Sequence, residues 1–177
     1  MKKTGIILYI VLLLPLLTSC WDQLPLSNLK LLDVAGFNLN DSGEVEIHSL
    51  ETNLKSDGLG NGEQKSVITV ETGPSLLKAT AKNGLTSRVY YGADTRIYLL
   101  SEKFALEYPV SDLTFLLDAP YASIHSPVAI LEGNLPKYLK DNLKNNEKFT
   151  TELNDYILTL EKRRLIPRVS MMDLILS

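Results

Sequence analysis

The sequence predicts an α/β (α+β) fold in which a mixed, largely antiparallel β-sheet is covered by α-helices. Two observations support this class. Segments in which apolar and polar residues alternate, as in strands, are interspersed with segments whose apolar residues recur at helical spacing. The chain has 177 residues, of which 45% are hydrophobic, so it can bury one substantial core.

The first half of the domain begins with two segments that predict an antiparallel hairpin. Residues 29–40 are rich in Leu and Val and predict a strand, and Asn40-Asp41-Ser42-Gly43 has the composition of a turn. Residues 44–54 then alternate as a second strand. The two faces of this second strand carry Val45, Ile47 and Ser49 on one side, and Glu44, Glu46 and His48 on the other.

A polar, glycine-containing loop over residues 55–65 leads into the clearest strand pattern of the chain, residues 66–72. Gly73-Pro74 then opens a helix that Asn83-Gly84 ends, because proline suits the first helical position and glycine suits the C-terminal cap. We expect the buried stripe of this helix to consist of Leu76, Leu77 and Ala81.

The second half of the domain mixes strand and helix patterns. The predicted strands are residues 95–100 and 126–132, and the predicted helices are residues 101–108, 110–117 and 149–163. Pro167 ends the last of these patterns, and Ser170 is positioned to cap a final helix that begins at Met171.

The first twenty residues have the layout of a secretory signal. Lys2 and Lys3 form a positively charged start, and residues 5–17 form an apolar run that is shorter than the ~20 residues of a membrane span. The run ends in Leu17-Thr18-Ser19-Cys20, the pattern of a bacterial lipobox. Cys20 is the only cysteine of the chain and stands where such a signal requires one, so we expect it to be lipidated.

These features divide the chain into a lipoprotein signal peptide (1–19), a membrane-proximal tether (20–28) and a domain (29–177). Cleavage would leave Cys20 as an amino terminus that carries diacylglyceryl and N-acyl chains. At about 0.8 kcal/mol per buried CH₂, one acyl chain anchors marginally and two anchor stably. The full chain has a formal net charge of −3 and loses Lys2 and Lys3 with the leader, so the lipid rather than a basic surface would hold it to a membrane.

The sequence carries no motif for catalysis, a metal or a nucleotide. A pI of about 5.4 argues against nucleic-acid binding, and one cysteine with two histidines cannot supply a four-ligand zinc site. Neither a G-x-S-x-G nor a G-x-x-x-x-G-K-[ST] motif occurs, and residues 38–49 lack the final acid of a calcium loop. We expect His48 and His125 to be ordinary surface residues. The prediction is therefore a protein that is not an enzyme and that uses no cofactor or metal.

Several short patterns follow one another in order. Cys20-Trp21-Asp22 completes the lipobox, and an extended Leu-x-x-x-Gly-Phe segment comes next. The later patterns are Val67-Ile68-Thr69-Val70 before the Gly-Pro helix, Arg88-Val89-Tyr90-Tyr91-Gly92 after it, Ser101-Glu102-Lys103-Phe104-Ala105, and Leu165-Ile166-Pro167-Arg168-Val169. Together they resemble the Ger(x)C (GerAC-like) lipoproteins, the C subunits of spore germinant receptors in Gram-positive spore formers. Ala93 departs from the family pattern, which usually has His after the Gly, so any role of that His is absent.

The resemblance implies a non-catalytic subunit that sits on the outer face of the inner membrane of the spore, held by the lipid on Cys20. It implies partners, an A subunit and a transporter-like B subunit, and a role in receptor assembly or signal relay during germination. Family members continue through further domains, so a chain ending at Ser177 is expected to hold the first domain alone. An alternative of another class is a lipid-anchored protein that captures a small ligand for a transporter.

Two segments are candidates for a surface that faces a partner. They are the loop at residues 55–65 and the segment at residues 88–92. The alternative interpretations are a loop without a partner for the first segment and a buried Tyr90 for the second.

Overall fold

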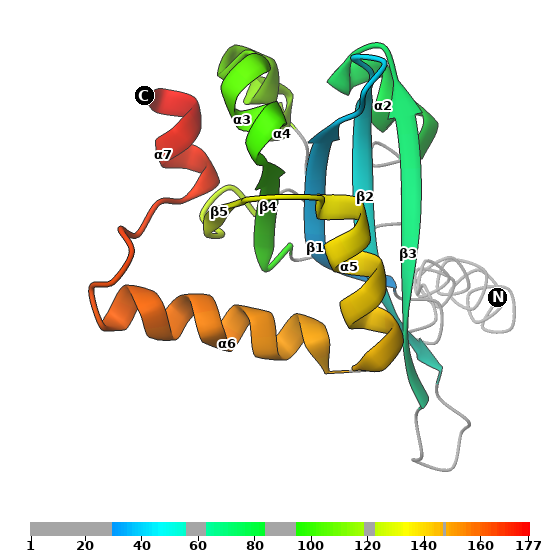
Figure 1. The fold of residues 1–177 in the computed structure, drawn as a ribbon, viewed down its shortest axis with the longest axis vertical. Helices are drawn as coiled ribbons and strands as arrows, with labels where there is room; N and C mark the ends of the chain where they lie inside the picture. Colours follow the sequence, from blue (N-terminus) through cyan, green and yellow to red (C-terminus); the bar gives the residue numbers. More distant parts are fainter. Residues whose placement is uncertain (1–29, 56–62, 84–94, 119–122, 147) are drawn as a thin grey trace, which may run out of the picture.

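The computed structural model describes residues 30–55, 63–83, 95–118, 123–146 and 148–177, which form a five-stranded sheet with helices on both faces (Figure 1). The strands are β1 (Lys30–Leu39), β2 (Val45–Lys55), β3 (Glu63–Gly73), β4 (Ile97–Ser101) and β5 (Val128–Leu131), in the spatial order β3-β2-β1-β4-β5. Long antiparallel pairings join β1 to β2 and β2 to β3, and shorter parallel pairings join β1 to β4 and β4 to β5. The predicted α+β class with a mixed sheet is confirmed.

The β1–β2 hairpin forms as its turn composition predicts. Oδ1 of Asn40 accepts hydrogen bonds from the backbone N–H groups of Ser42 and Glu44, at 3.0 and 2.9 Å. Gly43 has a φ of 77°, which glycine adopts without the steric cost that a side chain would add. The turn therefore fixes the register of β2, and Val45 and Ile47 lie together in one core as the alternation predicts.

One face of the sheet packs against α2 (Leu76–Asn83), α3 (Glu102–Glu107), the 3-10 helix η3 (Val110–Thr114), α4 (Phe115–Asp118) and α7 (Met171–Leu176). Phe37 of β1 contributes to this core, and its ring centroid lies 6.2 Å from that of Tyr98 and 5.7 Å from that of Phe104. Ser170 caps α7 as predicted, in a capping box with Asp173. The cap directs α7 so that Met171 is fully buried in the same core.

The opposite face is covered by α5 (Leu135–Asn145) and α6 (Phe149–Lys162); in Figure 1, α5 lies in front of the sheet and α6 runs across the lower left of the view. α6 matches the predicted amphipathic helix. α5 is missing from the sequence-based prediction, although its start carries two ordinary signals. Oδ1 of Asn134 accepts a hydrogen bond from the backbone N–H of Lys137 at 2.8 Å, and Pro136 lies in the first turn.

α2 differs from its prediction at its beginning. The helix begins at Leu76 rather than at Pro74, and Ser75 occupies the start, where its carbonyl oxygen accepts a hydrogen bond from the N–H of Ala79 at 2.9 Å. The side that packs on the sheet consequently includes Leu76 and Ala79, which are buried. Leu77, predicted to be buried, is 66% exposed.

The amino-terminal end of β1 is tied to both neighbouring strands by Asp33. The register of β1 against β2 shifts between Leu32 and Val34, which leaves Asp33 at a bulge. The buried carboxylate of Asp33 accepts a hydrogen bond from Oγ1 of Thr52 on β2, and it lies 3.3 Å from Nε of Arg96, just before β4. Its carbonyl oxygen also accepts a hydrogen bond from the N–H of Arg96 at 2.9 Å.

We predict that Gly73→Ala destabilises the domain. A Cβ at position 73 would lie 2.7 Å from the backbone nitrogen of Ala79, and a backbone atom of a packed helix cannot move aside cheaply. The expected loss in the free energy of unfolding is about 1–3 kcal/mol, measured by urea denaturation. Lys78→Ala, at an exposed position of α2, is the control and should change stability by less than about 0.5 kcal/mol. Equal stabilities of the two variants would contradict the close packing of α2 on β3.

Candidate functional site

A polar cleft lies at the carboxyl ends of the parallel strands β1 and β4. The chain leaves β1 toward β2 on one side, whereas it leaves β4 through α3 toward β5 on the other side. Two neighbouring parallel strands whose connections depart in opposite directions leave a crevice between them, a common place for ligands in such sheets. Here the crevice has a volume of about 490 Å³.

Three segments line the cleft. The hairpin supplies Asn38, Leu39, Asn40, Asp41 and Glu46, the start of α3 supplies Ser101, Glu102 and Lys103, and the segment that begins α5 supplies Gly133, Asn134 and Pro136. Most of these side chains are polar or charged, and the carboxylates outnumber the single lysine. The cleft can therefore form hydrogen bonds with a polar molecule of small size.

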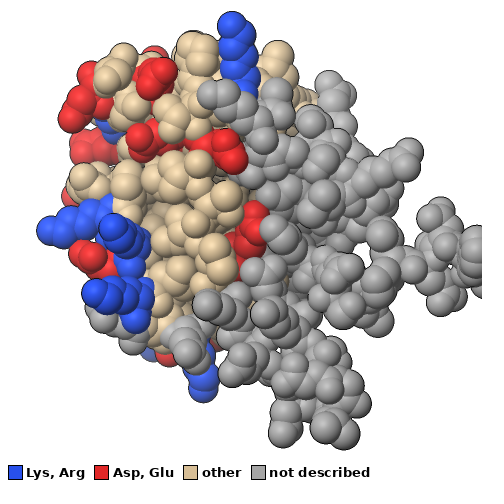
Figure 2. Space-filling view, turned by 90° about the vertical axis from the view of Figure 1, so that its right-hand side faces the viewer, with Lys and Arg blue, Asp and Glu red and all other residues tan. Residues whose placement is uncertain are grey.

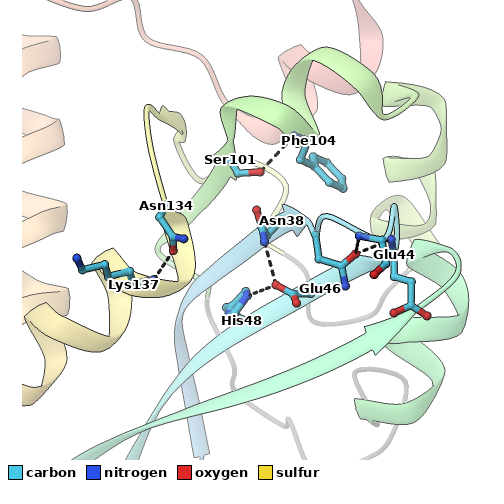
Figure 3. Close-up of polar contacts among 10 residues, drawn as sticks. Asn38, Glu44, Glu46, His48, Ser101, Phe104, Asn134 and Lys137 are labelled. Atoms are coloured by element: carbon cyan, nitrogen blue, oxygen red, sulfur yellow. Dashed lines mark hydrogen bonds and ion pairs between the residues drawn. The ribbon is translucent and has the colours of Figure 1, made fainter.

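Glu46 is the central polar group of the cleft (Figure 3). Its Oε2 accepts a hydrogen bond from Nδ2 of Asn38 at 2.9 Å and lies 3.2 Å from Nε2 of His48. Burial by itself raises the pKa of Glu46, but the hydrogen bonds from Asn38 and His48 and the attraction of His48 together outweigh it, so the pKa is lowered from its ordinary value. Glu46 is therefore an ionised acceptor at neutral pH.

His48 is buried, with 4% of its surface exposed, so its prediction as a surface residue is wrong. His48 lies on the same face of β2 as Glu46, as predicted, but α5 covers this face at His48. Gly36, opposite His48 in the β1–β2 pairing, lies beneath Leu135 and Leu139 of α5. Burial lowers the pKa of His48, and the neighbouring Glu46 counteracts this only in part. The imidazole is mainly neutral at pH 7 and, with its proton on Nε2, donates to Glu46.

The rim of the cleft is fixed by contacts within the protein. Nζ of Lys103 donates a hydrogen bond to the carbonyl oxygen of Asn40 at 2.9 Å, which joins the start of α3 to the hairpin turn. Oγ of Ser101 accepts a hydrogen bond from the N–H of Phe104 at 3.2 Å (Figure 3). These contacts hold the start of α3 and the hairpin turn in place at the rim of the cleft.

No group of three or more His, Cys, Asp and Glu side chains in the described part of the chain could hold a metal ion. The rejected calcium loop, residues 38–49, is the β1–β2 hairpin itself. His125 is exposed in the turn before β5, as predicted. Cys20, the leader, the tether and the segment at residues 88–92 lie outside the described residues, as does most of the loop at residues 55–65.

The fold and the cleft together define an α+β domain with a polar surface site at the carboxyl ends of its parallel strands. Residues 22–177 match the family model described as the spore germination protein N-terminal domain. The chain therefore belongs to this family and contains the N-terminal domain of a GerAC-like C subunit of a spore germination receptor, as the sequence motifs predict. Comparison with curated proteins and with solved structures gave no match. Within the described residues, no helix is both long and apolar enough to span a membrane.

We predict that acid destabilises this domain through His48. The pKa of His48 is lower in the folded chain than its ordinary value of 6.5, so the unfolded chain binds the proton more tightly. The stability that the neutral His48 contributes is fully present above pH 6.5 and is lost as the pH falls through the pKa of His48 in the folded chain. Because the pKa of Glu46 is also lowered, its protonation causes a second loss of stability below pH 4.5. The unfolding free energy of the wild type should therefore fall between pH 7.5 and pH 5.5.

His48→Gln keeps a polar side chain but removes this titration, so its stability should change less over the same pH interval. His125→Gln, at an exposed position, is the matched control and should follow the wild type. Thermal or urea unfolding at several pH values measures the effect. Parallel curves for the wild type and His48→Gln would contradict the assigned burial of His48.

Proposed function

We propose that this chain is a lipid-anchored, non-catalytic subunit of a nutrient germinant receptor, which acts in receptor assembly or signal relay with the A and B subunits. The observation that carries the proposal is the position of the family match. The spore germination domain begins at residue 22, two positions after the last residue of the lipobox Leu17-Thr18-Ser19-Cys20. A secretory leader, a single lipidation cysteine and a domain of this family thus follow one another, with only Trp21 between the cysteine and the domain.

The anchor is expected on chemical grounds. A thiol is the group that receives diacylglyceryl in lipoprotein maturation, and Cys20 is the only thiol that the sequence offers. The lipid would hold the domain at the outer face of the inner membrane of the spore, within reach of the two other subunits. The short interval between Cys20 and β1 would keep the sheet near the membrane surface.

A role in binding rather than catalysis agrees with the polar groups described above. Asn38, His48 and Glu46 contact one another, and Ser101 and Asn134 cap helices. Side chains in such contacts stabilise the fold and shape a surface, and the nucleophile-and-base pair that a hydrolase needs is not among them.

We predict that Cys20→Ala releases the domain from the membrane and abolishes its function in germination. In a spore former that lacks the gene, the wild-type chain should restore nutrient germination and take up a palmitate analogue. Cys20→Ala should lose the label, leave the membrane fraction and fail to restore germination, while sporulation proceeds normally in both strains.

The control is Ser19→Ala, which keeps a small residue before the cysteine and should behave as the wild type. Suppose that the wild-type chain is labelled but that its deletion, in a strain without a redundant paralogue, leaves germination with every nutrient unchanged. That result would contradict the receptor role. An unlabelled chain that stays in the membrane would contradict the lipid anchor alone.

A second candidate function, capture of a small ligand for a transporter, is favoured by the cleft beside Glu46. We predict that a ligand of this cleft raises the unfolding temperature of the mature chain, by an amount that grows with concentration. At 100 times Kd the stabilisation would be about 2.7 kcal/mol. Glu46→Gln should reduce the shift, and Glu107→Gln, an exposed position outside the cleft, should keep it. No shift with amino acids or sugars at millimolar concentration would count against this function.

A further inference from the structure

The two edges of the sheet differ in how their backbone groups are used. The outer side of β5 receives the C-terminal segment, because the N–H of Val128 donates to the carbonyl of Val169 at 2.9 Å and Pro127 forms a bridge with Ser170. β3 forms the other edge, and no strand of the described residues pairs with its outer side. Its eleven residues make it a long edge, and such an edge is a template for pairing with another strand.

The middle of β3 suits strand pairing. Val67 and Val70 are 40% and 47% exposed, on opposite faces of the sheet. Ser66, Ile68 and Thr69 between and beside them are partly exposed, so this stretch is uncharged and mostly β-branched. Figure 2, which looks at the molecule from the β3 side, shows uncharged surface across the middle of the described part, with charged residues around it. The central stretch Ser66–Val70 therefore carries no charged side chain that would oppose pairing with another strand.

The sequence of β3 is complementary to itself in one antiparallel register. When two copies of the strand Glu63–Gly73 overlap along their whole length, Ile68 lies opposite Ile68, and Lys65 lies opposite Glu71. By symmetry the lysine–glutamate pair occurs twice. Opposite charges directly across an antiparallel pair stabilise it, and like charges destabilise it. Moving the centre to Val67 would place Glu63 opposite Glu71, and moving it to Thr69 would leave Lys65 opposite Gly73.

We propose that β3 pairs with β3 of a second copy of this chain, in the antiparallel register centred on Ile68, so that the two sheets form one continuous sheet. The register that gives the most backbone hydrogen bonds is also the one with two attractive charge pairs. Because the longest overlap and the attractive charge pairs occur in the same register, a second copy of this chain is the partner that we propose for the β3 edge. The proposal does not depend on the lipid anchor or on the receptor partners.

Cysteine cross-linking in membranes of cells that make the full chain tests the proposal. In this register position 68 faces itself, and position 70 faces position 66 of the other copy. Ile68→Cys should therefore give a disulfide-linked dimer after mild oxidation, on a non-reducing gel. Val70→Cys made together with Ser66→Cys should also give the dimer, whereas Val70→Cys alone should not. Leu106→Cys, 78% exposed on α3, and the wild type, with Cys20 alone, are the controls.

Charge reversal tests the register independently. Lys65→Glu replaces two attractive pairs with two repulsive ones and should lower the dimer yield of the Val70→Cys and Ser66→Cys pair about tenfold. Lys65→Glu combined with Glu71→Lys restores opposite charges and should restore the yield. Because positions 66 and 70 are partly exposed, this reporter tests the pairing even if Ile68→Cys weakens the core.

Three results would support the proposal: a dimer from Ile68→Cys, a dimer from Val70→Cys only when Ser66→Cys is also present, and recovery of that dimer by the exchange of Lys65 and Glu71. Cross-linking of Ile68→Cys no stronger than that of Leu106→Cys, together with no product from the Val70→Cys and Ser66→Cys pair, would overturn it. A cross-link at this edge to a protein other than this chain, without the dimer, would also overturn it.

Discussion

The burial of β1 and β4 on both faces is the constraint on which the rest of this structure depends. Val34 and Phe37 of β1 belong to different cores, and all five residues of β4 are buried. A strand that is apolar on both sides requires a helical layer on each side, because either layer alone would leave large side chains in water. The helices α2, α3, α4 and α7 meet this requirement on one face, and α5 and α6 meet it on the other.

Double-sided burial also limits where polar groups can lie in the sheet. Two polar clusters lie toward opposite ends of the sheet, although Ser49 and Glu51 are also buried in the middle of β2. At one end the carboxylate of Asp33 accepts a hydrogen bond from Thr52 and lies beside Arg96. At the other end the carboxylate of Glu46 accepts a hydrogen bond from Asn38 and lies beside His48. Within the described residues every buried side-chain nitrogen or oxygen has a partner. The cleft is consequently the continuation of a structural network, and its polar surface exists because the strands must end there.

Local patterns predicted most of the elements, and non-local packing accounts for the errors. The hairpin could be predicted from Asn40 and Gly43, and α6 from apolar residues at helical spacing. In each case the residues that form the signal are close together in the sequence. α5 was missed because its mean composition is polar, and its start signals at Asn134 and Pro136 are short. That one omission also produced the error at His48, since the residue is buried by a helix about ninety positions later in the chain. The cleft could not be predicted, because it is formed by three segments that only the strand order brings together.

A domain whose buried polar groups are satisfied internally contributes to a receptor through its surface. Two surfaces of the described residues, the cleft beside Glu46 and the outer edge of β3, differ in chemistry. The cleft presents an ionised carboxylate and amides, which suit a polar molecule, whereas the edge presents backbone groups and β-branched side chains, which suit another strand. The two surfaces share β2, because Glu46 lines the cleft and lies opposite Thr72 of β3, but the proposed contact is centred on Ile68, four positions before Thr72. If two copies pair through β3 as proposed, the contact would be centred away from the cleft, which would leave the cleft accessible to a ligand.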